Sequence, residues 1–307
     1  MGHCIAMRVS LRKQIQAMKL KTRPISHFAT VLMALALLPC GAFAGDRVLA
    51  SSGVSQVEGA AGGGLSPWAV IAGQGSRDQI GATAFATGVH TRGGYQLDVQ
   101  GVALGLYDTV ELSAAHWRFG LSDTVPGYSL RMQVFGLKWR VMGDAVFDAD
   151  SWKPQVAVGV QYKHNTDAFV PDLLGAKRTK DAEPYVAITK LWFGAAGGYN
   201  LLTNVTLRAT RANQMGLLGF GGDAGDSRRI KPEASVAVLP RDNVAIGVEY
   251  RAKPSNLSAA PETRAADFFV AWWPMRNLSV TAAWLDLGQI ANKTSQRSSY
   301  VSVQVQF

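Results

Sequence analysis

The chain has 307 residues, of which 31 are lysine or arginine and 22 are aspartate or glutamate, and its formal net charge is +9. Six of the basic residues and none of the acidic ones fall within the first 44 residues, so residues 45–307 carry only +3, which argues against a nucleic-acid partner. Both cysteines, Cys4 and Cys40, lie in the same first segment, which leaves the remainder without a thiol for a disulfide, a metal site or a nucleophile.

The first 44 residues have the three parts of a secretory signal peptide. A basic region precedes an apolar run of 11 residues, 28–38, and Ala42-Phe43-Ala44 then predicts cleavage before Gly45. The apolar run is well short of the ~20 residues that a membrane-spanning helix needs, so a retained anchor is the less favoured alternative. The basic region is long for a signal peptide, which leaves Met7 and Met18 as alternative starts.

Beyond this segment, several stretches alternate between apolar and polar residues. In 155–163, for example, Val156, Val158 and Val160 share one face and Lys163 lies on the other, because successive strand side chains point to opposite faces. A soluble sandwich would turn the apolar face inward, whereas a transmembrane barrel would turn it outward, between girdles of aromatic residues. Aromatic residues near many predicted strand ends favour the barrel. The clearest alternating stretches are 155–163, 204–210, 233–238, 243–251, 278–284 and 299–307.

Two of the predicted strands change phase at a glycine. Apolar residues occupy one parity up to Val99 and the other from Val102, with Gly101 between them, and a similar change surrounds Gly136. A glycine at such a point is typical of a β-bulge, which bends a strand in a barrel wall. We therefore predict bulges at these two glycines.

The connections between the predicted strands alternate in length, as in outer-membrane barrels, which have short turns in the periplasm and long loops outside the cell. This pattern predicts an all-β protein with a single transmembrane antiparallel β-barrel of about 12 to 14 strands over residues 67–307. Either 48–58 adds a wall strand or one proposed strand is spurious, so residues 45–66 are interpreted as a first strand or an insert in the lumen. The short turns are 107–109, 240–243 and 274–277, and the long loops are 163–183, 214–229, 252–264 and 288–298.

The last predicted strand ends the chain. Val301, Val303 and Val305 lie on its apolar face, together with the terminal Phe307. A final strand of this kind resembles the signal that the barrel-assembly machinery reads in outer-membrane barrels. We therefore assign Phe307 as the insertion signal.

Six stretches spread along residues 45–307 carry a resemblance to a known family. They are 57–65, 77–82, 105–108, 213–223, 249–254 and 269–272. They are similar to a family of proteobacterial outer-membrane proteins that is defined only as domain of unknown function 3034. The resemblance implies a barrel, and it implies no activity, cofactor or catalytic residue.

Five charged residues on the polar faces of the predicted strands are candidates to line a pore. If the barrel is open, they set the selectivity of a water-filled channel. The alternative is that they pair across the lumen and close it. The candidates are Lys163, Arg208, Glu233, Glu249 and Arg251.

The loop 215–222 is unusually apolar for a connection that would face water. One hypothesis is that Leu217, Leu218 and Phe220 fold into the mouth of the barrel as a constriction or meet an apolar ligand. The alternative is a hairpin tip that packs on its own rim.

A barrel hydrolase would need a serine and a histidine on one strand face. His116 is the only histidine within a predicted strand, and Ser113 lies on the opposite face by parity. We therefore predict no enzymatic activity, no cofactor and no metal.

The sequence as a whole predicts an exported protein of the outer membrane of a Gram-negative bacterium, with outer-membrane lipid and the assembly machinery as its partners. The most favoured function is a porin-like passive channel for small solutes. The alternatives are a plugged structural or binding barrel and, less favoured, a barrel hydrolase.

Overall fold

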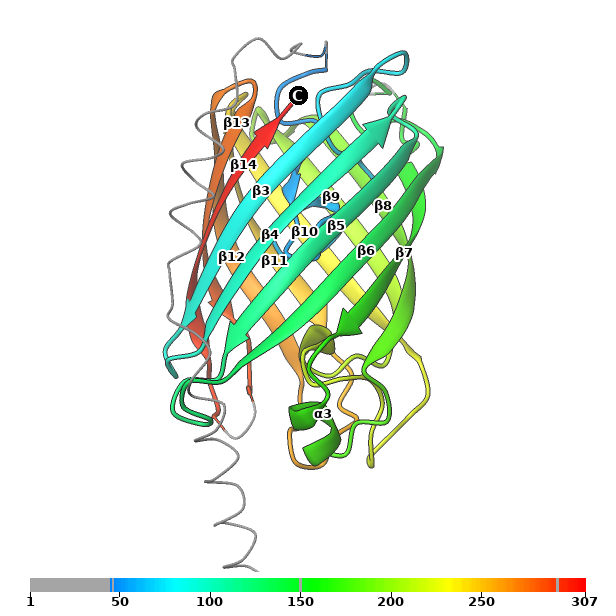
Figure 1. Ribbon diagram of the computed structural model, residues 1–307. Helices are drawn as coiled ribbons and strands as arrows, with labels where there is room; N and C mark the ends of the chain where they lie inside the picture. The colour runs from blue at the N-terminus through cyan, green and yellow to red at the C-terminus, as the bar shows by residue number, and fades with distance from the viewer. Residues whose placement is uncertain (1–44, 46, 149–150, 291–292) are drawn as a thin grey trace, which may run out of the picture.

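The computed structural model describes residues 45, 47–148, 151–290 and 293–307, so the predicted signal peptide lies outside the described residues. Twelve antiparallel strands close into one barrel, in which each strand pairs with its neighbours in sequence and the last pairs with the first (Figure 1). The predicted all-β barrel is confirmed at the lower strand number. The wall strands are β3 (Ile80–Thr91), β4 (Gln96–Leu106), β5 (Val110–Gly120), β6 (Ser129–Met142), β7 (Gln155–Asn165), β8 (Lys180–Ala196), β9 (Tyr199–Thr210), β10 (Arg229–Arg241), β11 (Val244–Ala252), β12 (Arg264–Met275), β13 (Leu278–Asp286) and β14 (Arg297–Gln306).

The apolar faces of these strands point away from the lumen. Val248 is 51% exposed and Leu207 is 48% exposed, whereas the neighbouring Glu249 and Arg208 are 3% and 0% exposed. A soluble sandwich would bury the apolar residues and expose the charged ones. The wall therefore has the arrangement of a transmembrane barrel, with an apolar exterior and a polar interior.

The predicted bulges at Gly101 and Gly136 are wrong, because β4 pairs with both neighbours, and β6 with β5, in one unbroken register. An added Cβ would lie 2.4 Å from Phe85 Cε1 at Gly101 and 2.3 Å from Ser113 Oγ at Gly136, so each glycine leaves room for a lumen side chain. The change of phase has another cause. Near one end of the barrel the inner face is itself apolar, and Val99 is fully buried there.

The two rims of the barrel differ. One rim, here called the turn rim, carries the turns 107–109, 197–198, 242–243 and 276–277 and the longer connection 143–154. The other, the loop rim, carries 92–95, 121–128, 253–263 and 287–296, a loop with α3 (Phe169–Leu173) and a loop with the 3-10 helix η1 (Gln214–Gly216). The chain ends at the turn rim (Figure 1), where the backbone of Phe307 hydrogen-bonds to Ala82 and to the N–H of Gln74.

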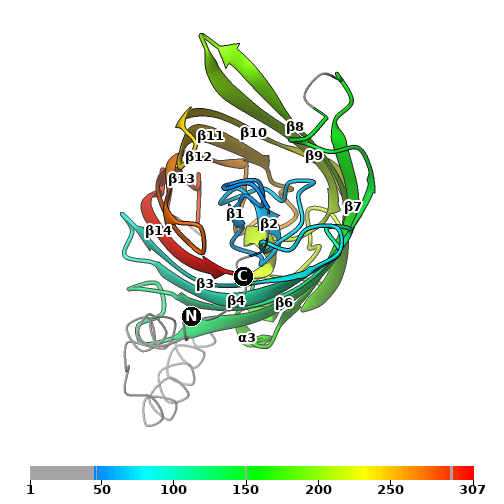
Figure 2. The ribbon, with the colours of Figure 1, turned by 90° about the horizontal axis from the view of Figure 1, so that it is seen from above.

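Residues 47–79, here called the inserted segment, precede the wall, and their hairpin of β1 (Val54–Ser55) and β2 (Ala61–Gly62) lies inside the ring of strands (Figure 2). Every residue from 52 to 75 is buried. The residues 48–58 therefore add no wall strand. The wall begins at Ile80, so residues 67–79, predicted from the sequence to be part of the barrel, belong to the inserted segment instead.

Candidate functional site

Glu58 projects from the β1–β2 hairpin, and its carboxylate is fully buried in the lumen. Three wall cations reach it. Arg251 Nη2 lies 2.8 Å and Arg208 Nη2 lies 3.3 Å from its oxygens, and the Lys163 ammonium forms a third ion pair. These cations come from β11, β9 and β7. One carboxylate of the inserted segment therefore connects three strands of the wall.

Two wall carboxylates complete this set of charges. Glu233 Oε1 lies 2.6 Å from Arg208 Nε and 3.4 Å from Arg251 Nε, and Glu183 pairs with Lys163. An unpaired charge is strongly unfavourable in a protein interior. Three cations meet three carboxylates here, so the charges balance only while the inserted segment is in place. We call this set the lumen network: Glu58, Lys163, Glu183, Arg208, Glu233 and Arg251.

Glu249, the fifth charged residue singled out from the sequence, binds backbone instead of a cation. Its Oε2 accepts the N–H of Leu65 at 2.8 Å, and its Oε1 accepts the hydroxyl of Ser235 at 2.7 Å. Asp267 lies directly across from it on β12 and is also buried. Among the described residues Glu249 has no ion-pair partner. It therefore holds the glycine-rich part of the inserted segment against the wall.

The close approach at Glu249 makes a prediction for the glycine run. A Cβ added to Gly63 would lie 2.1 Å from Glu249 Oε1, whereas one added to Gly64 would make an ordinary contact at 3.4 Å. We expect Gly63→Ala to lower the free energy of unfolding by about 1–3 kcal/mol, as overpacking does, and Gly64→Ala to change it much less. Denaturant unfolding of the two purified variants measures this difference. Equal stabilities would show that the Glu249 side chain moves away from the added methyl group without loss of stability.

A second anchor, not singled out as such from the sequence, lies closer to the turn rim. Lys138 donates to the carbonyls of Ala61 (2.9 Å) and Val70 (2.8 Å) and pairs with Glu111 at 3.0 Å. Glu111 in turn accepts the N–H groups of Ala61 and Ala72. In the sequence, Glu111 and Lys138 both fall on the polar parity of two adjacent predicted strands, and this feature could have indicated the pair. The structure places them directly opposite each other.

The loop around η1 packs against the inserted segment near the loop rim. Leu217 and Leu218 are buried and Phe220 is fully buried, and Asn165 donates to the carbonyl of Leu217. The leucines belong to the same apolar cluster as Val57 of the inserted segment. A cavity of about 50 Å³ lies between the loop, the inserted segment and the wall. The segment and the loop thus meet inside the barrel from opposite rims.

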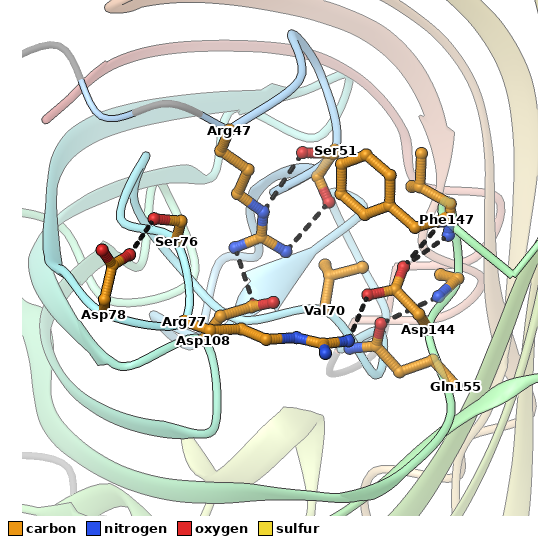
Figure 3. Close-up of a pocket in the computed structure, with 12 residues that line it drawn as sticks. Arg47, Ser51, Val70, Ser76, Arg77, Asp78, Asp108, Asp144, Phe147 and Gln155 are labelled. Atoms are coloured by element: carbon orange, nitrogen blue, oxygen red, sulfur yellow. Dashed lines mark hydrogen bonds and ion pairs between the residues drawn. The ribbon is translucent and has the colours of Figure 1, made fainter.

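A cavity of about 280 Å³ lies at the turn rim, between the inserted segment and the connection 143–154 (Figure 3). Asp108 lies 3.2 Å from Arg47 and 2.7 Å from Arg140. Burial raises the pKa of Asp108. Burial also tends to raise the pKa of Asp144, but the N–H groups of Phe147 and Val146 together with Arg140 and Arg77 outweigh it, so this pKa lies below its usual value. Side chains of both charges line this cavity: Arg47, Arg77, Asp78, Asp108 and Asp144.

The histidines do not reach the lumen. His90 and His116 are exposed on the outer face of the wall, His164 shares that face by the strand alternation, and Ser113 is buried on the inner face. Ser113 and His116 therefore lie on opposite faces of β5 and do not form a Ser–His pair. Over the part of the chain that the structure describes, no group of three or more potential ligands is arranged to hold a metal ion, and no helix is long and apolar enough to cross a membrane.

Comparison with known proteins identifies a family. Residues 51–304 match the sequence profile of a family described as protein of unknown function (DUF3034). A search of curated protein sequences finds no match.

Several solved structures are similar to this chain at low TM-scores. A KdgM porin in complex with disordered oligogalacturonate has a TM-score of 0.47 at 9% identity, over 73% of this chain and 99% of that one. A NanC porin has a TM-score of 0.46 at 12% identity, over 72% and 98%. The outer membrane protein Omp33 of Acinetobacter baumannii has a TM-score of 0.45 at 6% identity, over 76% and 100%.

Proposed function

The chain belongs to the DUF3034 family of proteins of unknown function, and we propose that it is an outer-membrane channel for small solutes that its own inserted segment holds closed. The observation that carries this proposal is the lumen network. The wall supplies three cations and two carboxylates, and the third carboxylate, Glu58, comes from the inserted segment. In a permanently plugged barrel, all the charges of the network could come from the wall. Because Glu58 belongs to the inserted segment, the wall charges are balanced only while the segment is inserted.

The wall behind the segment supports the same proposal. Many of its inward side chains are small, and examples are Ala157, Ala187, Thr206, Ser235 and Ala245. Barrels of eight strands are filled by their own side chains, and wider ones leave an interior that something else must occupy. In this 12-strand barrel the inserted segment fills that space. Its displacement would therefore leave a polar passage.

The location in the outer membrane rests on the chain's own features. The outer face is apolar over most of its circumference, and exposed Trp139, Trp272 and Trp284 lie near strand ends. Such girdles mark the membrane interfaces of outer-membrane barrels. The predicted signal peptide and the terminal Phe307 supply export and insertion. In this arrangement the turn rim faces the periplasm and the loop rim faces outward.

Single-channel recording in a planar lipid bilayer tests the proposal. We expect the refolded chain 45–307 to be closed for most of the time and a variant lacking both residues 47–75 and the loop residues 215–221 to show stable stepwise openings, because neither the inserted segment nor the loop then obstructs the lumen. Heat-modifiable electrophoretic mobility verifies that both proteins are folded barrels. A folded deletion variant that stays silent would refute the channel.

A permanently plugged structural or binding barrel is the second candidate, since 24 consecutive residues of the segment, 52–75, are buried. The two candidates differ in one respect. When the contacts between the inserted segment and the wall are weakened, a plugged barrel stays closed, whereas a gated channel opens.

A further inference from the structure

The outer face of the wall is polar on one side of the barrel, from mid-strand to the loop rim. Across β4, β5 and β6 the outward residues form two rows in register: Gln100 opposite His116 opposite Gln133, and Asp98 opposite Arg118 opposite Arg131. His164 of β7 continues the first row and Gln96 of β4 lies beyond the second. We call these residues the wall patch: Gln96, Asp98, Gln100, His116, Arg118, Arg131, Gln133 and His164.

The other side of the barrel has no such patch at the corresponding positions. Near their loop-rim ends β11, β12 and β13 present Tyr250, Phe268 and Trp284 outward, and Trp284 is 62% exposed. An arginine on the lipid face of a barrel is unfavourable, most strongly at the bilayer midplane and less toward the interface. The wall patch therefore needs a polar partner that the rest of the wall does not.

Arg118 and Arg131 form the centre of the wall patch. They are directly opposite each other on neighbouring strands and point to the same face, an arrangement that is destabilising for like charges. Neither guanidinium has a carboxylate within ion-pair distance among the described residues. Asp98, across from Arg118 on the other side, accepts a hydrogen bond from Gln96 at 3.1 Å. Two adjacent arginines are thus left with unused donors on a surface that faces lipid.

We propose that Arg118 and Arg131 bind a phosphate group of a phosphorylated glycolipid in the outer leaflet, with His116 and Gln133 beside it. This inference rests on the proposed location in the outer membrane, where the loop rim lies in the outer leaflet. A phosphate neutralises both guanidiniums and matches their planar arrays of donors. The neighbouring imidazole and amide supply further donors for an oxygen-rich headgroup.

The charge of the wall patch decides between this lipid and a second copy of the chain. A two-fold contact through the wall patch would bring two Arg118–Arg131 pairs together, and their four positive charges would face only two Asp98 carboxylates. Like charges across an interface oppose association. The wall patch is therefore complementary to an anion and not to itself.

The test compares lipid binding by two matched double variants. Native mass spectrometry of the folded chain 45–307 in non-ionic detergent measures its affinity for bisphosphorylated lipid A and for the same lipid without its phosphates. We expect Arg118→Gln/Arg131→Gln to lower the affinity for the phosphorylated lipid by about tenfold or more, because two charge-assisted contacts are lost. The control Arg264→Gln/Arg297→Gln removes two exposed arginines from the loop-rim ends of β12 and β14. It should change the affinity by about twofold or less.

Several results would overturn the site. They are an unchanged affinity in the Arg118/Arg131 variant, equal binding of the lipid without phosphates, displacement of the lipid by an equal concentration of inorganic phosphate, or a wild-type dimer that the variant loses. Conductance of the same proteins separates this inference from the proposed channel. Lost lipid binding with unchanged conductance supports the site, and phosphate-dependent binding by a barrel that never conducts would refute the channel and retain the site.

Discussion

Replacing Glu58 with glutamine is expected to open the barrel for much of the time. The substitution keeps the size of the side chain but removes the negative charge that three buried cations share. Removal of one partner from a buried ion pair is unfavourable by about 3–5 kcal/mol. The substitution destabilises the state with the segment inserted and not the state with the segment released. The ratio of released to inserted segment should therefore rise by roughly a hundredfold or more. Single-channel recording measures it as open probability.

A wall residue of the same network provides the matched control. Glu233 is also a buried carboxylate that contacts Arg208 and Arg251, but it belongs to β10. Glu233→Gln removes the same charge and leaves the wall cations more dependent on Glu58. We therefore expect the control to lower barrel stability without raising open probability. If both variants open equally, charge balance in the wall controls the barrel and the inserted segment does not.

The strand pattern predicts which residues share a face of the wall, and the aromatic girdles indicate which face meets lipid. Side chains alternate with a period of two, so once the apolar parity is known to face lipid, Lys163, Arg208 and Arg251 must face the lumen. The direction itself came from the aromatic girdles, because alternation is the same in a sandwich. The same logic failed at Gly101 and Gly136. There it assumed that every apolar residue faces outward, whereas Val99 packs against the segment and loop that fill the lumen.

The partner of these charges could not be predicted from the pattern. Glu58 lies 105 residues from Lys163 and 193 from Arg251 along the chain. Its surroundings form only the two-residue strands β1 and β2, which are too short to give a periodic signal. Pairing of this kind depends on how a glycine-rich chain folds within a closed wall, and local propensity carries no information about it. The sequence therefore left residues 45–66 open between a wall strand and an insert.

A reversible tether between segment and wall should make conduction depend on the redox state. Residues 45–307 contain no cysteine, and an added Cβ at Gly59 would lie 3.3 Å from Ala115 Cβ, close to the Cβ–Cβ separation of about 3.5–4.5 Å in disulfides. We expect Gly59→Cys/Ala115→Cys, introduced together with Glu58→Gln, to be silent when oxidised and to conduct when reduced. The measurement is current through one set of inserted channels before and after addition of a reductant.

Comparison within one variant removes the main ambiguity of this experiment. Gly59 has φ 100°, so a cysteine there is strained in both redox states, and any loss of stability is common to the two recordings. A disulfide holds only the hairpin that carries Glu58 and leaves the loop around η1 free. If the oxidised channel conducts as well as the reduced one, solutes pass without movement of the inserted segment. If the current appears only on reduction, release of the segment from Ala115 is the step that opens the barrel, and the loop follows or is displaced with it.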